Sequence, residues 1–207
     1  MKKAIIILII SIFGGQNLMQ AADNFENPVG KTDSDGIGWY ISLDNNYTTI
    51  NDKLSFTLGA RGAIKISDYL AVGIAGSAIW YDHRLNDLDP DRTYHLEGGY
   101  AGFYIEPMLP IGDNFMLSMQ IVFANGFAQF KYDSKYNKEL TWTEEIIDRD
   151  EFGVFEPTLH AQYMLGDNWA LGANVSMRST SPMEMLGAGE GMLNNVSFGF
   201  SVKYVNF

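Results

Sequence analysis

Apolar residues occur at every second position in long stretches of this chain. In the first such stretch, Leu54, Phe56 and Leu58 alternate with polar residues. Successive side chains of a β-strand point to opposite faces, so this period predicts strands with one apolar and one polar face. The same alternation occurs at residues 54–66, 70–80, 115–123, 155–163 and 196–204.

The two predicted faces differ in character. The apolar face is bulky and often aromatic, whereas the other face carries Gly, Ala, Ser and isolated charges. A bulky apolar face suits lipid, and a face of small residues suits a narrow polar interior. We therefore expect an all-β protein, an eight-stranded antiparallel transmembrane β-barrel. Its strands are predicted at residues 37–48, 54–66, 69–81, 96–110, 115–132, 151–165, 168–179 and 192–206.

Short and long connections separate the predicted strands. Three short connections are near copies, each with an aspartate between apolar residues, at 66–70, 111–115 and 165–169. Asp and Asn favour tight turns and Gly supplies a positive φ, so these segments are predicted hairpin turns. The connections between them are longer and polar, at about 82–96, 133–151 and 179–192. Short turns at one end and long loops at the other are typical of an outer-membrane barrel.

The first 22 residues have the layout of a secretory signal peptide. Lys2 and Lys3 precede an apolar run from Ala4 to Phe13, and the small pair Ala21–Ala22 follows. The run is too short to cross a bilayer as a helix. We expect a cleavable signal peptide at 1–22, a periplasmic segment at 23–35 and the barrel at 36–207.

The last predicted strand runs from Ser197 to Asn206 and is followed by Phe207. An amphipathic last strand that ends in Phe resembles the C-terminal assembly signal of bacterial outer-membrane proteins. Together with the hairpin layout, it makes the chain similar to the small eight-stranded outer-membrane β-barrel family, the OmpA/OmpX-like type. The resemblance implies a place in the bacterial outer membrane among lipid and lipopolysaccharide. It also implies that the barrel-assembly machinery reads Phe207.

Composition and charge exclude several classes of protein. The chain has no cysteine, which excludes a disulfide scaffold and a thiolate metal site. Its net charge of −11 argues against nucleic acid as a partner. The three long polar connections hold thirteen acidic and five basic residues, a net charge of −8. We therefore expect acidic outer loops.

Residues that could carry metal or catalytic chemistry are few. The hard oxygen ligands of the second outer loop could hold a divalent cation, but the loop lacks the Gly and distal Glu of a calcium loop. A solvated acidic loop is the favoured interpretation, and no metal or cofactor is predicted. A lipid-modifying enzyme would need His near Ser with an orienting acid, and no His is followed two residues later by Ser. The loop residues concerned are Asp82, His83, Asp87, Asp89, Asp91 and His95.

Charged residues on the polar face are expected inside the barrel. Eight strands enclose an interior just filled by side chains, and charges buried there must be paired. We interpret these residues as a structural network, with a gated ion path as the alternative. Counting from the turn at 165–169 places Glu156 opposite Arg178, which predicts an ion pair. The expected network consists of Asp44, Arg61, Lys65, Glu106, Glu156, His160, Arg178 and Lys203.

These features favour a structural or interaction role, in which a filled barrel displays acidic loops outside the cell. Specificity would lie in the loops, for an extracellular or outer-membrane protein partner. The alternatives are a small channel or transport accessory, a lipid-modifying enzyme, and a secreted soluble barrel. The soluble barrel would bind an apolar ligand and would require the bulky face to point inward.

Overall fold

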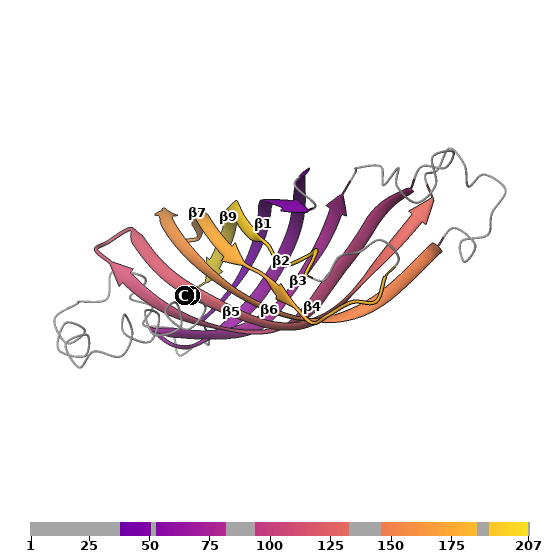
Figure 1. Ribbon diagram of the computed structural model, residues 1–207. Coiled ribbons are helices and arrows are strands. Elements are labelled where there is room, and N and C mark those ends of the chain that lie inside the picture. Colours follow the sequence, from indigo (N-terminus) through magenta and orange to yellow (C-terminus); the bar gives the residue numbers. More distant parts are fainter. Residues whose placement is uncertain (1–37, 51–52, 82–93, 133–145, 186–190, 207) are drawn as a thin grey trace, which may run out of the picture.

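The computed structural model describes residues 38–50, 53–81, 94–132, 146–185 and 191–206. These segments form a closed antiparallel ring of strands (Figure 1). The ring closes because β1 pairs with both β2 and β9, and β5 pairs with both β4 and β6. The strands are β1 (Trp39–Ile50), β2 (Lys53–Ser67), β3 (Leu70–Tyr81), β4 (Tyr94–Ile111), β5 (Phe115–Tyr132), β6 (Ile146–Leu165), β7 (Trp169–Met177), β8 (Ser179–Thr180) and β9 (Val196–Asn206). No helix in these segments is long and apolar enough to cross a membrane.

The predicted eight-stranded barrel is confirmed, with changes in three of its strands. The predicted seventh strand is divided into β7 and β8, with Arg178 between them. The Arg178 N–H still donates to the Asn195 carbonyl at 2.9 Å, in the register of the neighbouring pair of Met177 and Val196. The two-residue β8 pairs only with β6. The sixth strand begins at Ile146, five residues before the predicted start at 151, and the last begins at Val196 instead of 192.

The barrel is sheared by ten residues. From Phe115 of β5 the paired positions lead through β6, β7, β9, β1, β2 and β3 to Ala101 of β4. Ala101 pairs with Asn125 of β5, so one circuit returns ten residues further along the same strand. Such a stagger tilts the strands by about 35–45° from the barrel axis. A row of paired residues followed round the ring therefore shifts along the barrel axis, from the end with the short turns towards the opposite end.

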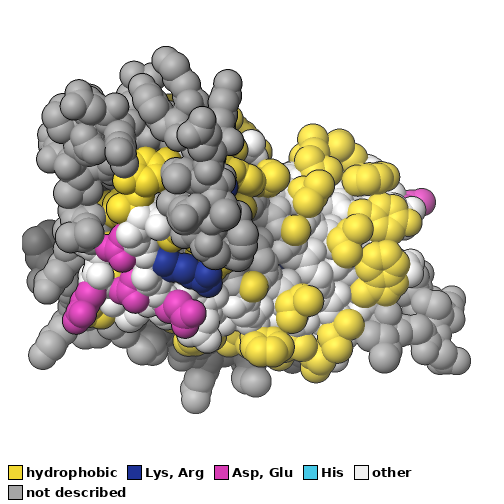
Figure 2. Space-filling model, turned by 90° about the vertical axis from the view of Figure 1, so that its right-hand side faces the viewer, with side chains coloured by type: hydrophobic (Ala, Val, Ile, Leu, Met, Phe, Trp, Pro, Cys, Tyr) yellow, Lys and Arg dark blue, Asp and Glu magenta, His cyan; other side chains and the backbone are white. Residues whose placement is uncertain are grey.

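Strict alternation places the bulky apolar side chains outside. In β1, Ile41 and Leu43 are 55% and 63% exposed, while Ser42 and Asp44 between them are buried. The outer apolar side chains cover much of the surface seen in Figure 2, whose acidic side chains lie mostly towards one end. The interpretation as a soluble barrel with the bulky face inward is therefore wrong, because this outer face suits lipid.

Outward-facing aromatic side chains contact one another near both ends of the strands. Tyr204 lies 5.8 Å from Trp39 and 5.2 Å from Trp169, measured between ring centroids near the short turns. Phe56 and Trp80 stack at 5.4 Å near the opposite end. Aromatic girdles at the two interfaces are typical of membrane barrels. We call the end with the short turns the periplasmic end and the other the outer end.

Candidate functional site

The inward-facing side chains form three zones between the two ends of the barrel. The zone at the periplasmic end and the zone at the outer end are mainly apolar, and the middle zone is polar and charged. The periplasmic zone contains Ala63, Ala71, Met108, Met116, Met164, Ala170 and Val205. The middle zone contains Asp44, Asn46, Arg61, Glu106, Ser118, Gln120, Glu156, Thr158, His160, Gln162, Asn174, Arg178 and Lys203. The outer zone contains Ile50, Ile79, Leu96, Phe130, Phe152, Met183, Met185, Met192 and Leu193.

Arg61 is the centre of one cluster in the middle zone. Its Nε donates to Asp44 Oδ2 at 2.5 Å, and a second nitrogen donates to Asp44 Oδ1, so the pair is bidentate. The remaining nitrogen donates to Gln120 Oε1 and, at 2.8 Å, lies against His160 Nε2. A fork-to-fork geometry with further partners compensates the loss of hydration that burial imposes. β1, β2, β5 and β6 are joined across the lumen by this one side chain.

Glu106 is the centre of a second cluster. It is fully buried, and Lys203 Nζ lies 3.3 Å from its Oε1. Ser118 donates to the same oxygen at 2.6 Å, and the Tyr40 hydroxyl donates to Oε2. Lys203 Nζ also lies 3.9 Å from the centre of the Tyr40 ring, a cation–π distance. This carboxylate is thus held by one charged and two neutral partners.

Glu156 and Arg178 are both buried but do not form the predicted ion pair. The predicted register is confirmed, since Thr158 pairs with Ser176 two positions away. The Tyr100 hydroxyl donates to Glu156 Oε2 at 2.8 Å, while Arg178 Nε donates to the Leu193 carbonyl at 2.9 Å. The guanidinium carbon of Arg178 lies 5.8 Å from the Tyr100 ring centroid. Tyr100 therefore lies beside both groups.

Lys65 lies near the periplasmic end of the interior, beside the turn at 66–70. Its Nζ pairs with Asp68 in the adjacent turn at 2.8 Å. The pairing of β2 with β3 shifts by one residue between Lys65 and Ser67, and such a bulge re-aims neighbouring side chains. Lys65 itself pairs with Ala71 in the regular register, and its place in the central network stays a prediction.

Most of the partners that sequence reasoning missed are neutral. Tyr40, Tyr100, Ser118 and Gln120 all hydrogen-bond to a buried charged side chain. Each has the inward parity of its strand, which was the only available signal. Their roles depend on which strands meet across the lumen.

Described residues on the chain between β8 and β9 are buried at the outer mouth. Met183, Met185, Met192 and Leu193 are buried, although they lie outside the strands. The segment is fixed by the bond from Arg178 to the Leu193 carbonyl and by Asn194, whose Oδ1 accepts from Thr180 N at 2.6 Å. An apolar cluster thus closes the lumen at this end.

Some predicted residues lie outside the described segments. These include Phe207 and the loop residues Asp82, His83, Asp87, Asp89 and Asp91. His95 is described, and its Nε2 lies 2.8 Å from Glu97 Oε1. Within the described residues, no three His, Asp or Glu side chains are grouped closely enough to hold a metal ion.

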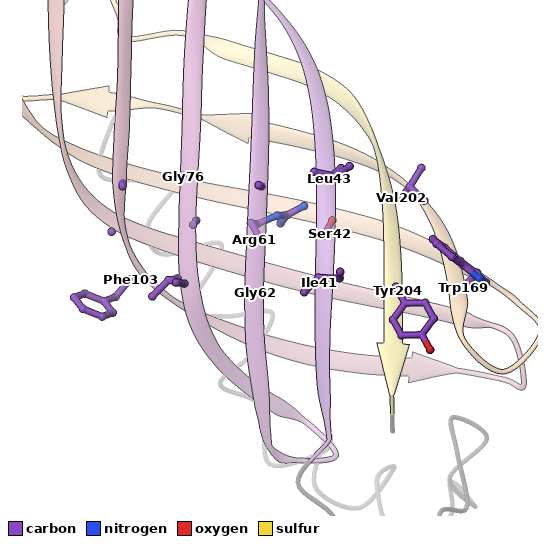
Figure 3. Close-up of a pocket in the computed structure, with 15 residues that line it drawn as sticks. Ile41, Ser42, Leu43, Arg61, Gly62, Gly76, Phe103, Trp169, Val202 and Tyr204 are labelled. Atoms are coloured by element: carbon purple, nitrogen blue, oxygen red, sulfur yellow. The ribbon is translucent and has the colours of Figure 1, made fainter.

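The outer surface has a groove of about 910 Å³ (Figure 3). It extends over β7, β9, β1, β2, β3 and β4, and its lining includes Gly62 and Gly76. Ile41, Phe103 and Tyr204 are among the large side chains around it. Because the groove lies on the lipid-facing surface and is almost wholly apolar, it suits acyl chains rather than a polar substrate.

Comparison with known proteins supports the same architecture. No family model and no curated protein matches the chain. The structure resembles Ail, the attachment invasion locus protein of Yersinia pestis, with a TM-score of 0.51 at 10% identity over 83% of this chain and 99% of Ail. It also resembles Neisserial surface protein A, with a TM-score of 0.52 at 8% identity over 82% of this chain and 95% of that protein. The match to the outer-membrane enzyme PagL is looser, with a TM-score of 0.38.

These likenesses show the fold. The chain has the fold of the small eight-stranded outer-membrane barrels, as its sequence predicted. With the exposed apolar belt, this fold supports the predicted location in the bacterial outer membrane.

Proposed function

We propose that this protein is a closed outer-membrane barrel that binds a cationic partner at its acidic outer end. The filled interior supports the first part of this proposal, that the barrel is closed. Ion pairs cross the middle zone and apolar side chains fill both ends, so a continuous aqueous path is replaced by packed side chains. The barrel then serves as a rigid support, and its function depends on the surface that it exposes at its outer end.

The outer end has a suitable surface for such a partner. β4, β5 and β6 are 18, 18 and 20 residues long, against 9 to 15 for the other long strands, and they project beyond them (Figure 1). β6 pairs with β7 and β8 only from Val154 onward, so its first eight residues have a strand on one side alone among the described segments. This part of β6 carries Asp148, Asp150 and Glu151.

The charge of this surface selects the partner's chemistry. Glu151 and Glu184 are exposed near the outer edge of β6, and the Glu184 N–H donates to Asp150 at 2.6 Å. An acidic surface favours association with basic proteins or peptides and disfavours sulfated ligands. Ail was crystallised with a sulfated heparin analogue. We expect the opposite preference here.

Two alternatives have less support. A small channel or transport accessory would need a path through the interior, which the clusters around Arg61 and Glu106 cross. A lipid-modifying enzyme would need a Ser, a His and an acid together at the outer surface. The described histidines, His95 and His160, lie against Glu97 and Arg61, and no serine hydroxyl of the described segments is bonded to the ring of His160.

Binding of a defined cation tests the proposal. The purified protein in lipid nanodiscs should bind biotinylated poly-L-lysine with an affinity that falls steeply with salt. It should not bind sucrose octasulfate. The double variant Glu151→Lys with Glu184→Lys should weaken poly-L-lysine binding severalfold.

The matched control reverses two charges at the opposite end. Asp113→Lys with Asp167→Lys changes the net charge equally in the periplasmic turns and should leave binding nearly unchanged. Equal effects of the two variants, or binding that is insensitive to salt, would reject a specific acidic outer surface.

A further inference from the structure

The middle zone encloses a small polar chamber. It has a volume of about 30 Å³ and lies between the Asp44–Arg61 pair and Glu156. Side chains from seven strands line it, so it is an interior space and not a surface groove. Its polar lining consists of Asp44, Asn46, Arg61, Ser77, Tyr100, Gln120, Glu156, Thr158, His160 and Asn174.

Four of these side chains hold polar atoms without a hydrogen-bond partner among the described residues. They are Asn46 Oδ1, Gln120 Nε2, His160 Nδ1 and both amide atoms of Asn174. The four side chains are 9%, 2%, 1% and 4% exposed, so bulk water does not satisfy them. Buried polar groups are nearly always paired, with protein or with ordered water. Four such groups around one chamber therefore point to a bound molecule.

The pattern of donors and acceptors limits what that molecule is. Arginine can only donate, so His160 Nε2 accepts from Arg61 and the ring hydrogen lies on Nδ1. Gln120 Nε2 and Asn174 Nδ2 are further donors, while Asn46 Oδ1 and Asn174 Oδ1 are acceptors. The occupant must accept and donate hydrogen bonds within the same small space.

Charge and volume then select among small molecules. An anion would face the carboxylates of Asp44 and Glu156, and a cation would face the guanidinium of Arg61. A neutral molecule that both donates and accepts avoids either repulsion. One water needs roughly 10–15 Å³ of such space, so the chamber has room for about two.

We propose that the chamber binds two ordered water molecules, which connect the cluster around Arg61 with the Tyr100–Glu156 pair. The waters satisfy the amides of Asn46 and Asn174 and the free nitrogen of His160. Two side-chain clusters that otherwise share no direct bond become one hydrogen-bonded unit. The interior is then hydrated locally and still closed to ions.

One substitution distinguishes a hydrated chamber from a dry one by the sign of its effect. Asn174→Val removes both amide atoms and places a methyl group in the chamber. If water fills the chamber, the variant displaces it and leaves Asn46, Gln120 and His160 unsatisfied. The melting temperature in detergent should then fall by roughly 3–10 °C. In a dry chamber, the same change removes unsatisfied atoms and the melting temperature should rise, which would overturn the proposal.

Asn125→Val is the matched control, because Asn125 is exposed on the outer face of β5. It should leave the melting temperature unchanged or slightly higher. A direct measurement on the wild-type protein keeps the test decisive if Asn174→Val does not fold. Magnetization transfer from water to the side-chain amide protons of Asn174 is expected in nuclear magnetic resonance spectra. Its absence would also overturn the proposal.

Discussion

At the scale of single residues, the buried charges of this barrel are held by neutral hydrogen-bonding side chains as well as by opposite charges. Asp44 and Glu106 each have one cationic partner, but serine, tyrosine, glutamine and histidine complete both clusters. A buried pair stabilises little in total, since dehydration offsets the attraction. Removing one member is more costly because the other charge is left alone.

The Asp44–Arg61 pair should show this asymmetry. Asp44→Ala is expected to lower the free energy of unfolding by about 3–5 kcal/mol, because it strands the Arg61 guanidinium. Adding Arg61→Ala should recover part of that loss. Urea unfolding in lipid vesicles measures both. A double variant less stable than Asp44→Ala would contradict a stranded charge.

Glu156 and Arg178 should behave differently. Their side chains make no direct contact, and both lie beside Tyr100. A double-mutant cycle with Glu156→Ala and Arg178→Ala is expected to give a coupling energy below about 1 kcal/mol. The Arg61–Asp44 cycle serves as the positive control. A coupling as large as that control would show that the two charges meet.

Cross-lumen contacts also show where prediction from sequence stops. Alternation predicts that Arg61 and Gln120 point inward, because side chains on a strand have a period of two. It does not predict that they meet, because β2 and β5 are not neighbours. Their meeting depends on the stagger of the whole ring. Lys65 shows the second limit, since alternation places it on the inward face but does not predict its ion pair with Asp68 in the adjacent turn.

At the scale of elements, some glycines lie where two strands approach closely and others do not. A Cβ on Gly102 of β4 would lie 2.1 Å from the Phe123 carbonyl of β5, a contact that real structures do not contain. A Cβ on Gly76 of β3 would meet nothing nearer than 3.9 Å. The first glycine is required by the pairing of two strands, and the second is not.

This contrast gives a paired prediction. Gly102→Ala should lower the free energy of unfolding by about 1–3 kcal/mol, because the backbone of β5 must move. Gly76→Ala is the control and should be neutral or slightly stabilising, since alanine reduces the freedom of the unfolded chain. Refolding yield and urea midpoint report on both. Equal losses would mean that close strand approach is not the cause.

Strand boundaries were predictable where alternation is clean and were missed where it is interrupted. β1, β3 and β5 lie within two residues of their predicted spans. The start of β6 was missed because residues 148–151 are all charged, which looks like a loop. The division at Arg178 has no signal in sequence, since it depends on pairing partners: β7 pairs with both β6 and β9, whereas β8 pairs with β6 alone.

At the scale of the whole molecule, the apolar zones at the two ends fill the lumen, and ion pairs and hydrogen bonds span the middle zone between them. We therefore expect a closed barrel. Reconstitution into planar bilayers should therefore give a conductance equal to that of protein-free lipid. Single-channel recording at both polarities measures this. Arg61→Ala is an informative comparison, because it removes the side chain that joins four strands. Stable openings in the wild-type protein would favour the channel alternative.

The pairing of β1 with β9 leaves the ring without an open strand edge between its first and last strands. Trp39 lies opposite Asn206, so the first and last strands of the ring complete each other's hydrogen bonds. Until β9 is in place, β1 and β7 each keep an open edge, and open edges pair readily with other chains. A chain that lacks β9 would therefore expose two unpaired strand edges, which favour association with other chains over a closed ring.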